Sequence, residues 1–288
     1  MVFTFALHAM NRLTLLPAIF LFVFCLGLGA PGSRAALPTI INVSAYDPKE
    51  RQRAGVGYSA NDVSALRANG ASALIARAGK GGNLDEKCAS FLASADRVGM
   101  LPGVYYRLQC HVDPVKQADQ FVARAQSLAR GRSWNAPALL LCADFDAHSR
   151  MSDILRFMDR VENRTGVVPV AYLENSAHLK SLLRHADAAT KAKIRRMPYW
   201  LALYSHNNGA ENPRALLQQY GVWSDWTIWQ YGGVDWERGR SRPKVYNHGG
   251  SRFPLYFGNM DRPLERNVFN GSLGSMQAFW QRHGLKLK

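Results

Sequence analysis

Acidic residues are scarce in this chain of 288 residues. It has 21 Asp and Glu against 36 Lys and Arg, which gives a formal net charge of +15 and a pI near 10. This balance favours an anionic partner, and nucleic acid, anionic lipid and an acidic polymer such as a bacterial cell wall all qualify. The charge alone does not choose among them.

Cysteine is also rare, with four residues in the whole sequence. That number excludes a small scaffold held together by disulfides, and no Cys/His spacing typical of a zinc site is present. Cys88, Cys110 and Cys142 lie beyond the N-terminal segment. Two possibilities follow for these three residues. Either two of them form a disulfide and the third is a free thiol, or all three are buried thiols.

Several catalytic motifs are missing. The sequence has no His-Glu-x-x-His, no Gly-x-Ser-x-Gly and no phosphate-binding P-loop, and its eight histidines are scattered. These absences argue against a zinc protease, a serine hydrolase of the nucleophile-elbow type and a P-loop nucleotidase. No metal and no cofactor is therefore expected.

The N-terminus has the pattern of an export signal. An apolar stretch covers residues 13–30, and Ser33 and Ala35 then supply the small-x-small pattern that signal peptidase prefers. We expect a cleaved signal peptide over residues 1–35 and a periplasmic or extracellular domain over 36–288. The alternative is an uncleaved membrane anchor at 13–30.

Removing Arg12 and Arg34 with the signal peptide leaves 34 basic and 21 acidic residues, or a net charge of +13. Export argues against a nucleic-acid partner. Membrane contact is expected only through the N-terminal segment, and no oligomeric state follows from the sequence.

The rest of the chain has no internal repeat and no linker, and its apolar segments alternate with helical patterns. Such alternation predicts an α/β fold with a parallel sheet, and seven or eight units favour a single (β/α) TIM-like barrel. A long loop insertion is expected from Gly232 to Phe257. The predicted helices cover 61–70, 85–99, 113–131, 151–164, two stretches of 176–195, and 272–283. The predicted strands are 39–44, 73–77, 103–108, 138–146, 167–173, 199–204 and 227–231.

Two carboxylates close the fourth predicted strand. Asp144 and Asp146 are two residues apart, so that both face the same side of a strand, at the end that opens onto the mouth of such a barrel. Paired carboxylates raise one another's pKa, which suits general acid chemistry. The plainer interpretation is a strand-end pair that caps the following helix.

Aromatic residues gather near the ends of the same strands, and five of the seven tryptophans lie between Trp200 and Trp236. Exposed rings near carboxylates suit the flat faces of sugars, whereas ordinary core packing is the alternative for at least half of them. The aromatic candidates for substrate binding are Tyr106, Tyr172, Trp200, Tyr204 and Trp229.

An ordered set of short segments resembles glycoside hydrolase family 25, the N-acetylmuramidase lysozymes. Ile-Asn-Val-Ser at 41–44 is similar to the family's opening Ile-Asp-Val-Ser, and Asp-Phe-Asp at 144–146 falls where the family has Asp-x-Glu. The resemblance spans roughly residues 39–283. The other matching segments are 76–81, 99–106, 169–172, 200–204, 229–231 and 265–271.

The resemblance implies a site and an activity. The family's four acids match Asn42, Asp144, Asp146 and Glu265, of which only Asp144 is unchanged. Asp146 would protonate the glycosidic oxygen, Asp144 would stabilise the transition state, and Asn42 and Glu265 would complete the floor of the cleft. Arg77 and Gln230 lie in matching segments and join the substrate-binding candidates.

Three functions follow from this resemblance. The first is a secreted lysozyme-type hydrolase of the β-1,4 linkage between N-acetylmuramic acid and N-acetylglucosamine, with peptidoglycan or a related anionic cell-wall glycan as partner. The second is a barrel that binds such a glycan without cleaving it. The third is a hydrolase of another polysaccharide.

Overall fold

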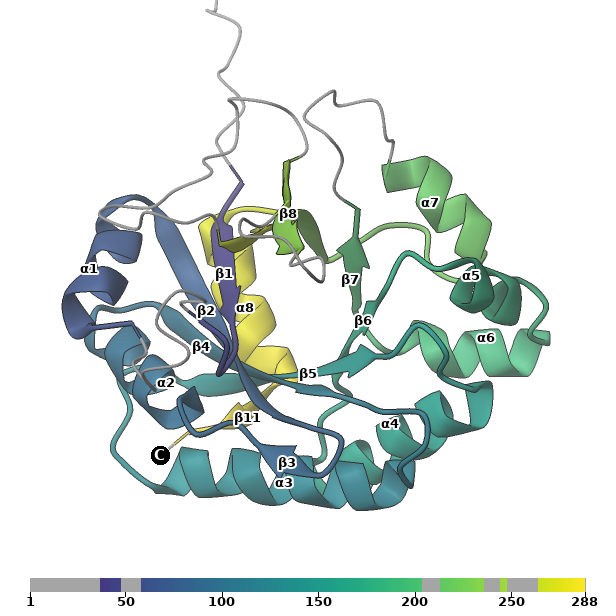
Figure 1. Ribbon diagram of the computed structural model, residues 1–288, viewed down its shortest axis with the longest axis horizontal. Helices are drawn as coiled ribbons and strands as arrows, with labels where there is room; N and C mark the ends of the chain where they lie inside the picture. Colours follow the sequence, from purple (N-terminus) through teal and green to yellow (C-terminus); the bar gives the residue numbers. More distant parts are fainter. Residues whose placement is uncertain (1–36, 48–57, 204–212, 236–243, 248–263, 288) are drawn as a thin grey trace, which may run out of the picture. The chain divides into compact units, whose positions relative to one another are not determined.

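Eight strands close into a barrel in the computed structural model, which describes residues 37–47, 58–203, 213–235, 244–247 and 264–287 (Figure 1). All of them belong to the unit Ala36–Lys288. Seven neighbouring strands are parallel. They are β1 (Thr39–Val43), β2 (Ala71–Lys80), β4 (Leu101–Arg107), β5 (Ala138–Phe145), β6 (Val170–Leu173), β7 (Tyr199–Ala202) and β8 (Ile228–Asp235).

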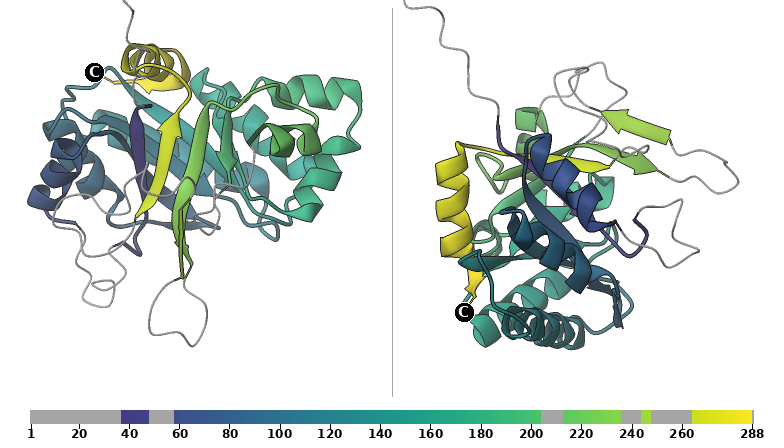
Figure 2. Two further views of the ribbon diagram at one scale, coloured as in Figure 1. Left: turned by 90° about the horizontal axis from the view of Figure 1, so that it is seen from above. Right: turned by 90° about the vertical axis from the view of Figure 1, so that its left-hand side faces the viewer.

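The eighth strand, β10 (Glu265–Phe269), closes the barrel and runs against both of its neighbours. Figure 2 (left) shows it in yellow between β1 and β8. The expected parallel sheet is present in the other seven strands, and the antiparallel direction of the closing strand was not anticipated. Because β10 is antiparallel, its first residue, Glu265, lies on the side of the barrel where the parallel strands end.

Helices connect the parallel strands. The sequence predicts most of them through their end signals: Asp113 accepts hydrogen bonds from the first turn of α3, and Gly166 ends α4 in the left-handed conformation. Helix α7 was not anticipated. The helices are α1 (Ala60–Ala68), α2 (Cys88–Arg97), α3 (Pro114–Arg130), α4 (Met151–Thr165), α5 (Ala177–Arg184), α6 (Ala188–Arg195), α7 (Pro213–Tyr220) and α8 (Leu273–His283).

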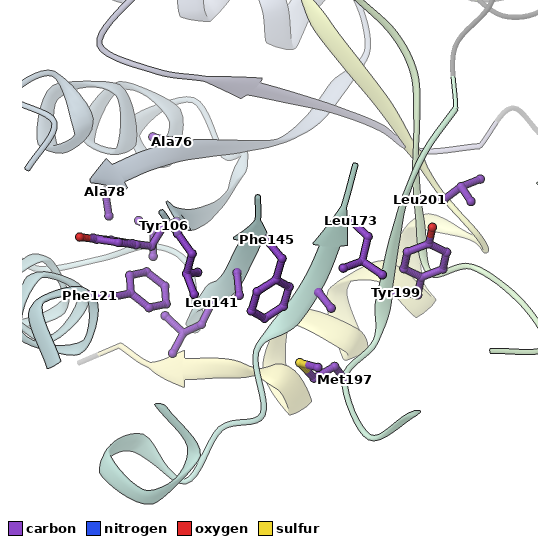
Figure 3. Packing of buried hydrophobic residues seen from close by; sticks show 14 of the residues in the cluster. Ala76, Ala78, Tyr106, Phe121, Leu141, Phe145, Leu173, Met197, Tyr199 and Leu201 are labelled. Atoms are coloured by element: carbon purple, nitrogen blue, oxygen red, sulfur yellow. The ribbon is translucent and has the colours of Figure 1, made fainter. Parts of the chain in front are cut away.

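Strand alternation divides the apolar side chains into two buried sets. One set faces outward against the helices, and Figure 3 shows part of it. The other fills the barrel interior. Gly103 of β4 lies in that interior, where an added Cβ would approach Ile75 Cγ1 to 3.0 Å. The main inner residues are Ile40, Ala73, Ile75, Tyr105, Leu140, Cys142, Val170, Trp200 and Ile228.

Helix α8 covers the end of the barrel where the parallel strands begin. Its residues Met276 and Trp280 are fully buried and belong to the interior set. The indole N–H of Trp280 donates to the carbonyl oxygen of Pro102 at 2.8 Å. Strand β11 (Gly284–Lys286) then pairs with β5, which holds the helix in place.

The region 232–257, expected to be a loop insertion, is partly regular. Strand β8 continues to Asp235 and pairs with β9 (Lys244–Asn247). The sequence pattern missed this pairing because Gly232 and Gly233 interrupt β8, and Gly has low strand propensity. The short strand β3 (Asn83–Leu84) forms a second hairpin with β2.

The predicted signal peptide, residues 1–35, lies outside the described residues. Within the described part of the chain, no helix is long and apolar enough to cross a membrane. Cys88, Cys110 and Cys142 are all free thiols.

Candidate active site

A cavity of about 250 Å³ opens where the parallel strands end. Its walls consist of inward-facing residues from the strand ends and from the segment that follows β1, as expected for the mouth of a barrel. The lining residues are Asn42, Ser44, Tyr46, Asp47, Arg77, Lys80, Tyr105, Arg107, Asp144, Tyr172, Trp200, Gln230 and Glu265.

Asp144 lies near the end of β5, and its side chain faces the cavity. The residue is only 6% exposed, and burial raises the pKa of its carboxyl to about 6 although the positive charge of Arg107 opposes the shift. Arg107 Nη1 lies 3.5 Å from Asp144 Oδ2. Asp144 Oδ1 has no hydrogen-bond partner among the described residues. The carboxyl group in the cavity wall therefore retains one buried, unsatisfied acceptor.

Glu265 reaches the same cavity because β10 is antiparallel. Its first residue pairs with Asn42 of β1, so the start of β10 meets the ends of the parallel strands. Burial, together with the negative charges of Asp47 and Asp144, raises the pKa of Glu265 to about 7, and a hydrogen bond from Asn42 opposes the shift. Two carboxyl groups with raised pKa values thus line one cavity.

A row of hydrogen bonds fixes how Asn42 faces Glu265. The indole of Trp200 only donates, so the oxygen of the Asn267 amide must face it, at 2.7 Å. Asn267 Nδ2 then donates to Asn42 Oδ1 at 2.8 Å. The remaining amide group of Asn42, its Nδ2, donates to Glu265 Oε2. The orientation of each amide therefore follows from its neighbour.

Gln230 is oriented in the same manner from the other side. Its Oε1 accepts from the hydroxyl of Tyr172 at 2.8 Å, and its Nε2 lies 3.3 Å from Asn42 Oδ1 and 3.5 Å from Glu265 Oε2. Both amide donors converge on one oxygen of Glu265. A proton on this carboxyl therefore belongs on the other oxygen, Oε1.

A second cavity of about 460 Å³ adjoins the first and shares Arg107, Tyr172 and Glu265 with it. The guanidinium of Arg107 lies between the two, because it contacts Asp144 in the first cavity and forms an ion pair with Glu174 in the second. The other residues of the second cavity are Asn175, Ser176, Ala202 and Leu203. The site is thus a two-part cleft that suits an extended ligand.

Arg77 forms part of the opposite wall. Its Nε lies 2.8 Å from Asp85 Oδ2, and its guanidinium lies 4.8 Å from the ring centroid of Tyr46. Asp85 also accepts from the backbone N–H of Ala45 at 2.8 Å. These contacts fix the segment that follows β1 against the cavity.

Two of the predicted substrate-binding aromatics face away from the cavity, and those predictions were wrong. Tyr106 is fully buried against α3, where its ring centroid lies 5.8 Å from that of Phe121 (Figure 3). Trp229 belongs to the outer set and donates to the carbonyl of Leu203 at 2.8 Å. Alternation along β4 and β8 sends their neighbours Tyr105 and Gln230 into the barrel instead.

Asp146 is not among the residues that line the two cavities, although its negative charge contributes to the raised pKa of Asp144. Strand β5 ends at Phe145, and the Asp146 carboxylate accepts from the backbone N–H of His148 at 2.9 Å in the following turn. Asp146 therefore lies in the turn that follows β5 and not, as had been expected, in the strand. Tyr204, the remaining aromatic candidate, lies outside the described residues.

The sequence interpretation missed several residues of the site, namely Asp47, Lys80, Tyr105, Arg107, Glu174 and Asn267. Strict alternation along the predicted strand 103–108 would have found Tyr105 and Arg107, since both occupy inward positions of β4. Among the described residues, no group of three His, Cys, Asp or Glu is arranged to hold a metal ion.

The chain is similar to known proteins both in sequence pattern and in fold. The sequence profile of glycosyl hydrolases family 25 matches residues 56–238. No curated protein sequence matches the chain. Among solved structures, the bacterial lysozyme from Streptomyces coelicolor has a TM-score of 0.58 at 17% identity, over 87% of this chain and 100% of that one.

Two fungal structures are similar to a comparable extent. The family 25 lysozyme from Aspergillus fumigatus has a TM-score of 0.55 at 16% identity, over 85% of this chain and 99% of that one. The muramidase from Acremonium alcalophilum has a TM-score of 0.54 at 15% identity, again over 85% and 99%. The barrel is the shared fold. Since the family profile spans more than half of the sequence, the chain belongs to glycosyl hydrolases family 25.

Proposed function

We propose that this protein is a secreted lysozyme-type glycosidase that cleaves the β-1,4 bond between N-acetylmuramic acid and N-acetylglucosamine in peptidoglycan. One observation carries the proposal: the carboxyl groups of Asp144 and Glu265 line the same cavity, and burial raises the pKa of both. Two carboxyl groups are what glycoside hydrolysis requires. Membership of a glycosidase family supports the same reaction.

Glu265 is the proton donor in this proposal. With a pKa of about 7 it holds a proton in mildly acidic solution, and the donors on Oε2 leave that proton on Oε1. Transfer of this proton to the glycosidic oxygen allows the leaving sugar to depart as an alcohol. The carboxylate that remains is stabilised by the amide N–H of Asn42.

Asp144 is the anionic partner. The positive charge of Arg107 favours its ionised form, and the residue lines the cavity proposed to hold the substrate. A carboxylate at this point stabilises the positive charge that develops on the sugar ring as the bond breaks. Asp146, bonded to its own turn, supports the strand end rather than the chemistry.

Tyr105, Tyr172 and Trp200 supply the apolar wall against which a sugar ring packs. Tyr172 and Trp200 meet edge to face, with ring centroids 5.2 Å apart, and the Tyr172 hydroxyl is held by Gln230. The wall is therefore rigid before substrate arrives. Export through residues 1–35 would bring the remaining charge of +13 to an anionic wall.

The test is release of reducing ends from purified peptidoglycan, with Asp144→Asn and Glu265→Gln as controls. Release that disappears in both variants supports the proposal. Absence of release, with retention of the protein on the same wall material, would instead support glycan binding without cleavage. Faster release from a polysaccharide that lacks N-acetylmuramic acid would favour a different substrate.

A further inference from the structure

Three cationic side chains line the main cavity, and two of them have acidic partners. Arg77 pairs with Asp85, and Arg107 pairs with Asp144 and Glu174. Lys80 forms no ion pair and no side-chain hydrogen bond with any residue in the described part of the chain. Its ammonium group is thus the cation of this wall that is available to a ligand.

An irregularity in β2 brings Lys80 into the cavity. The register between β2 and β4 shifts between Arg77 and Gly79, so that Arg77 pairs with Tyr105 and Lys80 with Arg107. In a regular strand, residues three apart face opposite sides, yet both Arg77 and Lys80 line the cavity. Bulges of this kind redirect side chains next to functional sites.

The hairpin that carries Lys80 is fixed from outside the barrel. Gly82 N–H donates to the Tyr106 hydroxyl at 2.8 Å, and Gln120 Nε2 donates to the carbonyl of Gly82 at 2.6 Å. An added Cβ at Gly79 would lie 2.5 Å from the carbonyl oxygen of Asn83, so the hairpin closes tightly at this glycine. The backbone that supports Lys80 is therefore preorganised.

Lys80 and Arg107 are also register neighbours on adjacent strands. Two like charges side by side repel each other, and an anion bound near them relieves that repulsion. Arg107 is already held by two carboxylates, whereas Lys80 retains all its donors. The position thus favours a ligand that carries negative charge on its periphery.

We propose that Lys80 binds a carboxylate of the glycan chain and thereby selects N-acetylmuramic acid over neutral amino sugars. This inference rests on the proposed function, since it names a specificity determinant of the same cleft. The carboxylate has two sources. It belongs to the lactyl ether when the stem peptide has been removed, and to the stem peptide when the lactyl group is bound in an amide.

The experiment measures binding, so that it does not depend on turnover. The full chain with Asp144→Asn and Glu265→Gln is titrated by calorimetry with three probes: glycan chains with stem peptides, chains freed of them by an amidase, and neutral oligomers of N-acetylglucosamine. Lys80→Gln is added to this background, beside Lys80→Arg and the exposed Lys116→Gln of α3 as a matched control.

We expect Lys80→Gln to weaken binding of one carboxylated probe by about tenfold, as the loss of one charge-assisted contact requires, and to leave the neutral oligomer unchanged. Lys80→Arg should retain most of the affinity, and Lys116→Gln all of it. The probe that responds identifies the source of the carboxylate.

An equal effect of Lys80→Gln on all three probes, or no effect on any, would overturn the inference, as would a wild-type cleft that binds none of them. Failure of the proposed function has a different signature. Wild-type protein would then release no reducing ends, while the difference between charged and neutral probes persists.

Discussion

At the scale of single residues, Glu265 and Asp146 are the two candidates for the proton donor, and their surroundings separate them. Glu265 lines the cavity with a pKa raised to about 7, whereas Asp146 accepts a hydrogen bond from the turn that follows β5. The side chain that protonates the glycosidic oxygen must line the cavity in which the substrate is proposed to bind. The geometry therefore favours Glu265.

This assignment gives a prediction for matched variants. Glu265→Gln should lower kcat by about 100-fold or more, while Asp146→Asn should lower it by less than about tenfold, because only the first removes the transferable proton. Initial rates of reducing-end release at saturating substrate measure both. A larger loss of kcat in Asp146→Asn than in Glu265→Gln would identify Asp146 as the proton donor instead.

A second prediction concerns pH. With Asp144 ionised and Glu265 protonated, kcat/KM should form a bell with its maximum between about 6 and about 7, the two raised pKa values. Arg107 lowers the pKa of both carboxyls, so Arg107→Gln should move the acid limb upward by about one pH unit and the basic limb upward as well. Arg160→Gln, which breaks an ion pair with Asp119 on the helical surface, is the control. Equal profiles for both variants would contradict the role given to Arg107.

The sequence predicts part of this site at residue scale. Asn42, Asp144, Glu265, Arg77 and Gln230 all line the cavity. The errors, at Tyr106 and Trp229, come from choosing residues by type where strand alternation decides which side chain faces inward. Neither residue type nor strand alternation predicts Lys80 in the cavity, because a bulge changes the alternation within β2.

At the scale of elements, the reversed direction of β10 is what completes the cavity. The seven predicted strands correspond to the seven parallel ones, and each contributes its end to the mouth. Segment 265–271 was recognised by its similarity to a family motif, but nothing in five residues reveals that the strand runs the other way. That direction depends on pairing with β1 and β8, which lie far from it in the sequence.

Helix α8 offers a prediction about stability. Trp280 is fully buried and closes the barrel end opposite the site, so Trp280→Ala should lower the free energy of unfolding by about 3–5 kcal/mol. Urea unfolding followed by circular dichroism measures this. Gln281→Ala, on the exposed side of the same helix, should change it little. Similar losses in both variants would show that α8 acts through its helical structure and not through the buried indole.

At the scale of the whole molecule, the two buried carboxyl groups of the site lower the free energy of unfolding near neutral pH. The carboxyls of Asp144 and Glu265 have higher pKa values in the folded than in the unfolded chain. The folded state therefore holds protons that the unfolded state has released, and the free energy of unfolding falls as pH rises from about 4 through about 7.

Glu265→Gln removes one of these contributions. The variant should be more stable than the wild type at pH 8, by on the order of 1 to 3 kcal/mol, and equal to it at pH 4, where the carboxyl is protonated in both states. Urea midpoints at the two pH values give the difference. A wild type that gains stability over the variant as pH rises would contradict the raised pKa.

The row of side chains from Trp200 through Asn267 and Asn42 to Glu265 also fixes the number of hydrogen atoms that the cavity wall holds. Every contact in it contains one hydrogen, and the indole at its head determines the order of all the others. An Asn42→Asp exchange would take a donor out of this sequence and bring a carboxylate against a carboxyl. The cavity would then require one more proton from solvent. The protonation of Glu265 is therefore coupled to the identity of residue 42, and an acid introduced at position 42 changes the number of protons that the pair holds.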